Sequence, residues 1–419
     1  MTEPSGHEAF IPVSRFALID RLTRDPAATD DYSRFLNALA ALQHQHYRQK
    51  LQRLKMLYLP FSPDRDTLRV LEYSEAEKQD MRSQLIDELT HLLERANYSR
   101  IHRSDLERIF NTQSDYGLAL RVDLSEYDDV LLFARGAGTE TGERRTAKSL
   151  FLRKESYTIP MFQRLFLLLK LKPESQRLAE IKDERGVSDR KAQKLLKKYR
   201  SKLPETISSD HIYLKTFKNI PQIDLEMLFP NTEVKLKPLD KLKLGVTAGG
   251  GTVGSAMGAF TKFAAAANPL AAAGVLFGLA GVIFRQVKKF FTQKNKYMMV
   301  MAQKLYFHNL ANNRGVLTLL TDRAEEEAIK ECFLLYHALF RKNTPCPADT
   351  LKQEIDVFVS KEFGAKIDFD LNSPAKALEE TGILQRDHND CLSALPPTEA
   401  LARIEAQWKA TLQQSSNLY

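Results

Sequence analysis

The sequence predicts an α+β protein that is mostly helical. Its expected parts are a helical front domain with a small antiparallel sheet, a two-helix transmembrane hairpin, and a helical C-terminal portion with a small helix-strand-helix module. Three observations predict this fold class. Apolar residues recur at spacings of three and four over much of the chain, which is typical of amphipathic helices. A central stretch changes to alternation, which indicates strands. Two long runs lack charge almost entirely, which is typical of membrane-spanning helices.

The front of the chain predicts helices with defined ends. Residues 31–59 have a helical apolar period, and prolines at positions 60 and 63 end it. A second helix begins at Ser74, because Ser74 and Glu77 have the spacing of a capping box. These elements predict a helical layer ahead of the sheet.

The strands follow in the next hundred residues. Residues 118–124 alternate, and 130–133 form a continuous apolar run, with the polar turn 125–129 between them. This arrangement predicts a hairpin. Residues 212–217 predict part of a further strand.

The segment 141–204 differs from the rest of the chain in its charge. It holds 18 Lys and Arg against 7 Asp and Glu, in a protein of net charge +8. Residues 178–200 predict a helix-turn-helix with Gly186 in the turn. Six cations crowd its second helix: Arg190, Lys191, Lys194, Lys197, Lys198 and Arg200. They predict contact with anionic lipid headgroups, and nucleic-acid binding by helix 188–200 is the alternative.

The uncharged runs predict a transmembrane helical hairpin over 241–291, with arms at about 244–264 and 269–291. Small residues in both arms predict close helix packing in lipid and a possible homo-oligomer. These residues are Gly250, Gly254, Gly258, Gly274 and Gly278. Basic residues flank both ends of the hairpin, so both soluble portions are expected in the cytoplasm. A buried Gly/Ala-rich hairpin in a soluble protein is the alternative.

Short stretches around this hairpin occur in an order that points to one family. They lie at 10–15, 62–67, 127–136, 213–221, 224–230 and 313–320. Together they resemble the transmembrane protein 143 family, uncharacterised membrane proteins sharing a domain of unknown function found in bacteria, plants and animals. The resemblance implies two transmembrane helices between soluble portions and supplies no catalytic residues. The segment 172–204 departs from the family pattern.

The expected division is a cytoplasmic helical/α+β domain at 1–240 with its basic insert 141–204, the hairpin at 241–291, and a C-terminal helical domain at 292–419. Catalytic motifs are absent, and the three cysteines are far apart. We therefore expect no enzyme, cofactor or metal site. The expected function is a membrane-anchored scaffold or interaction module at the cytoplasmic face of a bacterial inner membrane. Its partners would be the lipid bilayer and anionic lipids. A soluble or peripheral nucleic-acid-binding protein is the alternative.

Overall fold

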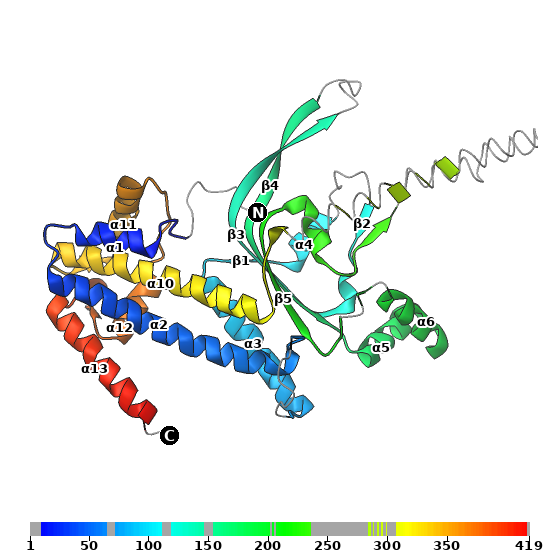
Figure 1. Ribbon diagram of the computed structural model, residues 1–419, viewed down its shortest axis with the longest axis horizontal. Coiled ribbons are helices and arrows are strands. Elements are labelled where there is room, and N and C mark those ends of the chain that lie inside the picture. The colour runs from blue at the N-terminus through cyan, green and yellow to red at the C-terminus, as the bar shows by residue number, and fades with distance from the viewer. Residues whose placement is uncertain are drawn as a thin grey trace, which may run out of the picture.

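The computed structural model describes residues 10–64, 72–110, 119–145, 154–201, 203–204, 207–235 and 307–416, and seven residues between 284 and 299. The described chain is α+β and elongated (Figure 1). A helical bundle occupies one end, an antiparallel sheet lies in the middle, and a separate helix pair lies at the other end.

The bundle joins helices from the two ends of the chain. Its members are α1 (Arg15–Thr23), α2 (Asp30–Tyr58), α3 (Glu75–Arg95), α10 (Arg314–Lys342), α11 (Ala348–Phe363), α12 (Asn372–Glu380) and α13 (Pro397–Ser416). The predicted capping box of α3 is confirmed, because the Ser74 hydroxyl accepts from the Glu77 amide and the Glu77 carboxylate accepts from the Ser74 amide. Aromatic rings of α2 and α10 meet in the core, where Phe35 and Tyr336 lie 4.2 Å apart between ring centroids.

The main sheet has five antiparallel strands in the order β1-β3-β4-β5-β7. Their bounds are Ser99–Ile101, Tyr127–Arg145, Lys154–Leu171, Ile212–Pro221 and Asn309–Asn312. Helices α2, α3 and α10 cover one face. The short helix α4 (Arg103–Phe110) and the 3-10 helix η4 (Gln222–Leu228) cover the other. The predicted strand at 212–217 is confirmed as part of β5.

The predicted hairpin around 125–129 is wrong in its pairing. Strand β2 (Ala119–Arg121) pairs with β6 (Glu233–Lys235) and not with β3. The long partner of β3 is β4, which the sequence reasoning missed. Successive leucines of β4 enter opposite cores, with Leu167 in one and Leu168 in the other. A strand buried on both faces shows no alternation of polar and apolar residues, which is why pattern reasoning overlooked it.

The C-terminal module contains a three-stranded sheet that the sequence reasoning did not foresee. Its strands are β8 (Cys346–Pro347), β9 (Leu384–Arg386) and β10 (Cys391–Ala394), in the order β8-β10-β9. With the end of α10, α11 and α12 before β9, this is the connectivity of a winged helix. The expected strand at 366–371 is not formed; that segment is an extended connection with a single bridge residue. Its apolar side chains Ile367, Phe369 and Leu371 enter the core.

A buried charged cluster ties the start of the chain to α10. The Glu327 carboxylate accepts from the Ile11 amide at 3.1 Å, and the Lys330 ammonium donates to the Ile11 carbonyl at 2.6 Å. Lys330 also pairs with Glu327 at 2.8 Å, and Arg135 of β3 reaches Glu327 at 3.2 Å. Glu327 and Lys330 are almost fully buried. Because each buried charge has a partner, the cluster fixes how the bundle meets the sheet.

A single asparagine joins the sheet to the start of α10. Asn313 has a positive φ of 48° and exchanges backbone and side-chain hydrogen bonds with Leu214 of β5. Its side-chain amide also donates to Asp64 at 2.7 Å. Asn313 thus connects the segment after α2, the sheet and α10 at one point.

The structure corrects the expected transmembrane hairpin. Among the described residues, no helix combines the length and the apolar character needed to cross a bilayer. Most of 241–291, including the five glycines Gly250, Gly254, Gly258, Gly274 and Gly278, lies outside the described residues. The expectation rested on runs without charge, and Gly and Ala gain little from leaving water because they bury little apolar surface. An uncharged run of this composition is therefore weak support for a spanning helix.

Candidate functional site

The predicted helix-turn-helix is confirmed as a helix pair. Helix α5 (Glu174–Arg185) ends at Gly186, which has a left-handed φ of 56°, and α6 (Asp189–Arg200) follows after Ser188. The positive φ suits glycine because no Cβ is present to clash. The two helices pack through the buried side chains of Ile181, Ala192 and Leu196.

Arg177 anchors this helix pair to the sheet. Its guanidinium donates to the Glu126 carboxylate at 2.9 Å and to the Ser125 hydroxyl at 2.7 Å, just before β3 begins. The Arg177 side chain is 3% exposed, and the nearby carboxylates raise its pKa against the opposing effect of burial. A buried charge with several hydrogen-bond partners holds its neighbours in one geometry. The helix pair is therefore fixed to the segment just before β3.

Five of the six predicted cations form one exposed face of α6. They are Arg190, Lys191, Lys194, Lys197 and Lys198. At 100° per residue these positions fall within an arc of about 120°. None of the five makes an ion pair with the residues that the structure describes. We call these five residues the basic face of α6.

The sixth predicted cation, Arg200, serves another purpose. Its guanidinium donates to the Lys172 carbonyl at 2.6 Å and pairs with Glu174 at 3.3 Å. Its side chain is only 17% exposed. Arg200 therefore closes α6 against the start of α5, and it is not available to the same extent for an external anion.

The opposite side of α6 is occupied within the protein. Ala192 and Leu196 are buried against α5, and Leu195 and Tyr199 are half-buried there. An amphipathic helix that inserts into a lipid interface needs a free apolar face. Helix α6 therefore exposes its charged side to solvent and packs its apolar side against α5.

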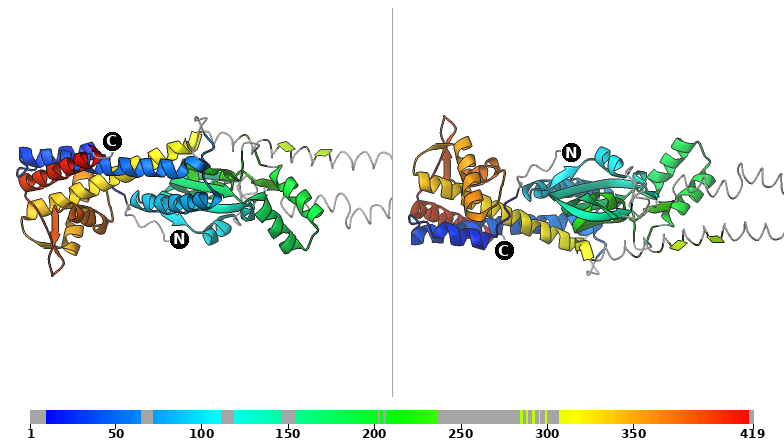
Figure 2. Two further views of the ribbon diagram at one scale, coloured as in Figure 1. Left: turned by 90° about the horizontal axis from the view of Figure 1, so that it is seen from below. Right: turned by 90° about the horizontal axis from the view of Figure 1, so that it is seen from above.

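Exposed apolar side chains lie at the same end of the molecule as the basic face. Phe284, Phe291 and Met299 are 69%, 54% and 62% exposed, and the basic residues Arg285 and Lys288 between them are exposed too. All three views place the described residues of this stretch and the α5–α6 pair at the end opposite α11 and α13 (Figures 1 and 2). Neighbouring large apolar and basic side chains on a surface are typical of a lipid-facing region.

The C-terminal module, despite its connectivity, does not present a basic surface. Residues 346–396 hold five Lys and Arg against ten Asp and Glu. The helix directly before β9 is α12, and it carries Glu379 and Glu380. The turn between β9 and β10 carries Asp387 and Asp390. Acidic residues at these positions would repel the phosphates of a nucleic acid.

Sequence reasoning identified the basic face from its period but missed two features of the site. The anchoring of Arg177 depends on Glu126, a residue 51 positions away in sequence, and no local pattern shows it. The exposed residues between 284 and 299 were assigned to the hairpin arm and its basic flank. Within the described residues, no group of three His, Cys, Asp or Glu side chains is placed to hold a metal ion.

Comparison with known families overturns the expected resemblance to the transmembrane protein 143 family. The family whose sequence model matches is described as a protein of unknown function, DUF3754, and the match covers residues 127–315. The stretches at 10–15 and 62–67 lie outside this match, and the order of short motifs was not specific enough to identify a family. No solved structure matches the chain. Over residues 127–315, which include the sheet strands β3, β4, β5 and β7 and the α5–α6 pair, the chain is similar to a family of unknown function.

Proposed function

We propose that this protein is an interaction module that docks on an anionic lipid surface through the basic face of α6. The observation that carries the proposal is the exposure of five cations without ion-pair partners among the described residues, on a helix anchored by Arg177. The helix holds these cations on one face before binding, and each Lys or Arg near an anionic leaflet contributes about 1 kcal/mol. The expected location at the cytoplasmic face of a bacterial membrane is part of this proposal.

Two features support lipid over nucleic acid as the partner. Four of the five cations on the basic face are lysines, which act as point charges, whereas base reading relies on the planar fork of arginine and on amide side chains. The exposed Phe284, Phe291 and Met299 at the same end of the molecule suit an interface with an apolar layer, not a phosphate backbone. Docking would thus combine charge from α6 with apolar contact from this segment.

The test is flotation of the full chain with vesicles of phosphatidylcholine, with and without about 30% phosphatidylglycerol. Replacement of Lys191, Lys194 and Lys198 by Gln should weaken binding to the anionic vesicles about 100-fold, at about 1 kcal/mol for each charge. The matched control replaces three exposed lysines of the C-terminal module, at the opposite end of the molecule: Lys361, Lys366 and Lys376. This control should bind as the unaltered chain does. Equal binding to both kinds of vesicle, or an unaffected α6 variant, would refute the proposal.

The helix-turn-helix geometry of α5 and α6 favours a second candidate, nucleic-acid binding by residues 188–200. It predicts that duplex DNA binds to the full chain with an affinity that falls steeply between about 50 and 200 mM salt. Fluorescence anisotropy with a labelled duplex measures this directly. If the duplex binds through the same three lysines and anionic vesicles do not bind, the nucleic-acid function replaces the lipid one.

A further inference from the structure

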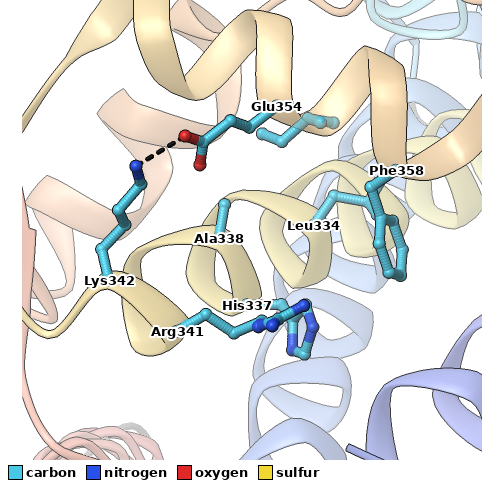
Figure 3. Close-up of a pocket in the computed structure, with 8 residues that line it drawn as sticks. Leu334, His337, Ala338, Arg341, Lys342, Glu354 and Phe358 are labelled. Carbon is cyan, nitrogen blue, oxygen red and sulfur yellow. Dashed lines mark ion pairs between the residues drawn. The ribbon is translucent and has the colours of Figure 1, made fainter.

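A cavity of about 240 Å³ lies between α10 and α11 (Figure 3), and α11 and α6 lie at opposite ends of the molecule (Figure 1). Its lining residues are Leu334, His337, Ala338, Arg341, Lys342, Glu354, Ile355 and Phe358. Of its apolar lining residues, Leu334 and Ile355 are buried, and Ala338 and Phe358 are half-buried. The charged residues are Arg341 and Lys342 from the end of α10 and Glu354 from the middle of α11. The cavity therefore has an apolar interior and a charged rim.

One polar side chain stands in the apolar part. His337 is 4% exposed, and its Nδ1 lies 2.8 Å from the Tyr32 hydroxyl. Its Nε2 makes no hydrogen bond to a described residue, and the nearest carboxylate, that of Asp25, is 3.7 Å away. That carboxylate favours a proton on Nε2, so Tyr32 donates to Nδ1. The neutral ring thus keeps its N–H donor on the side of Asp25, which is not among the residues that line the cavity.

The rim adds a positive charge beside this donor. The Arg341 side chain is 61% exposed, and its guanidinium lies 3.5 Å from the Asp25 carboxylate. The guanidinium has further N–H groups, which a second carboxylate could bind. Lys342 is paired with Glu354 at 2.6 Å, which leaves Arg341 as the more accessible cation of the rim. The Arg341 guanidinium and His337 Nε2 both approach the same carboxylate oxygen of Asp25, at 3.5 and 3.7 Å.

We propose that this cavity binds a small carboxylate with an apolar body. The carboxylate would accept from the Arg341 guanidinium, and the apolar body would contact Leu334 and Phe358. Bidentate or charge-assisted contacts of this kind suit a carboxylate better than a neutral oxygen. The volume exceeds that of an engineered cavity of about 150 Å³ that binds benzene, and it fits a ligand the size of benzoate or hexanoate. This inference is independent of the proposed lipid docking.

The test measures binding of benzoate and of the neutral benzyl alcohol to the full chain by saturation-transfer NMR titration. Benzoate should bind at least about 10-fold more tightly than benzyl alcohol, because only the carboxylate forms charge-assisted hydrogen bonds. Arg341→Gln should remove this preference. The matched control Arg34→Gln changes a similarly exposed arginine of α2, which is also paired with one Asp, and should leave it intact.

A second variant, Ala338→Leu, places a larger side chain in the cavity and should abolish binding of both compounds. If this variant fails to fold, as circular dichroism would show, the Arg341→Gln comparison still decides the question. Absence of benzoate binding at millimolar concentration overturns the proposal. So does an unchanged preference for benzoate in the Arg341→Gln chain.

Discussion

Acid should destabilise the protein through His337, and the size of the effect follows from its surroundings. Burial among Tyr32, Phe340 and Phe358 lowers the pKa of His337 to about 4, although Asp25 partly opposes the shift. In the unfolded chain the same imidazole titrates near its ordinary pKa of about 6.5. Between these values the unfolded chain takes up a proton that the folded chain does not. The stability due to neutral His337 is thus complete above about pH 7 and declines as the pH falls toward 4.

At 1.36 kcal/mol for each pKa unit, this group should cost about 2.5 kcal/mol of unfolding free energy between pH 7.5 and pH 4.5. Carboxylates also titrate in this range. The assay therefore compares the unfolding free energy of the unaltered chain with that of the His337→Gln variant at each pH. Urea unfolding can be followed by fluorescence of the single tryptophan, Trp408, which packs on the same core. The stability of the unaltered chain relative to the variant should fall by about 2.5 kcal/mol toward pH 4.5. A difference that stays constant with pH would refute the reasoning.

Three further substitutions test how the parts of the fold are joined. Lys330→Met should cost about 3–5 kcal/mol of unfolding free energy, because it leaves Glu327 buried with fewer partners. Urea unfolding would measure the cost, and a loss below about 1 kcal/mol would contradict the role of the cluster. Asn313→Ala should cost about 2–4 kcal/mol, since it removes two side-chain hydrogen bonds and strains a positive φ; an unchanged melting temperature would contradict this. Gly186→Ala should cost only about 1 kcal/mol, because a Cβ there meets no atom within 4 Å and only the left-handed backbone is strained. Loss of the α5–α6 pair in a melting scan would contradict this prediction.

The helices could be predicted because their causes are local. The capping box at Ser74 and Glu77 and the apolar period of α2 lie within one turn or one face, so sequence spacing is enough to find them. The sheet could not be predicted in the same way, because β2 pairs with β6 more than a hundred residues later. Pairing of that range depends on the tertiary fold and leaves no local pattern.

The candidate site also combines features that follow from local sequence with features that depend on the tertiary fold. The basic face of α6 follows from the helical spacing of its lysines, so the sequence was sufficient. The inward role of Arg200 depends on the position of Lys172 and Glu174, and the cavity at His337 depends on α2 and α11 meeting α10. The predicted transmembrane hairpin at 241–291 was wrong for a different reason: the absence of charge in that segment was taken as strong apolar character.

The shared core of the two chain ends has a consequence for how the protein folds during synthesis. Helix α2 buries Tyr32, Phe35 and Leu39 against α10 and the C-terminal module, and α10 ends at Lys342. Ribosomes add roughly 5–20 residues per second, so the completed α2 waits roughly 15–60 s for its partner. For that time its aromatic face has no native cover. The growing chain must therefore either shield this face with transient contacts or rely on a chaperone, and a ribosome stalled before α10 should display it to an apolar dye.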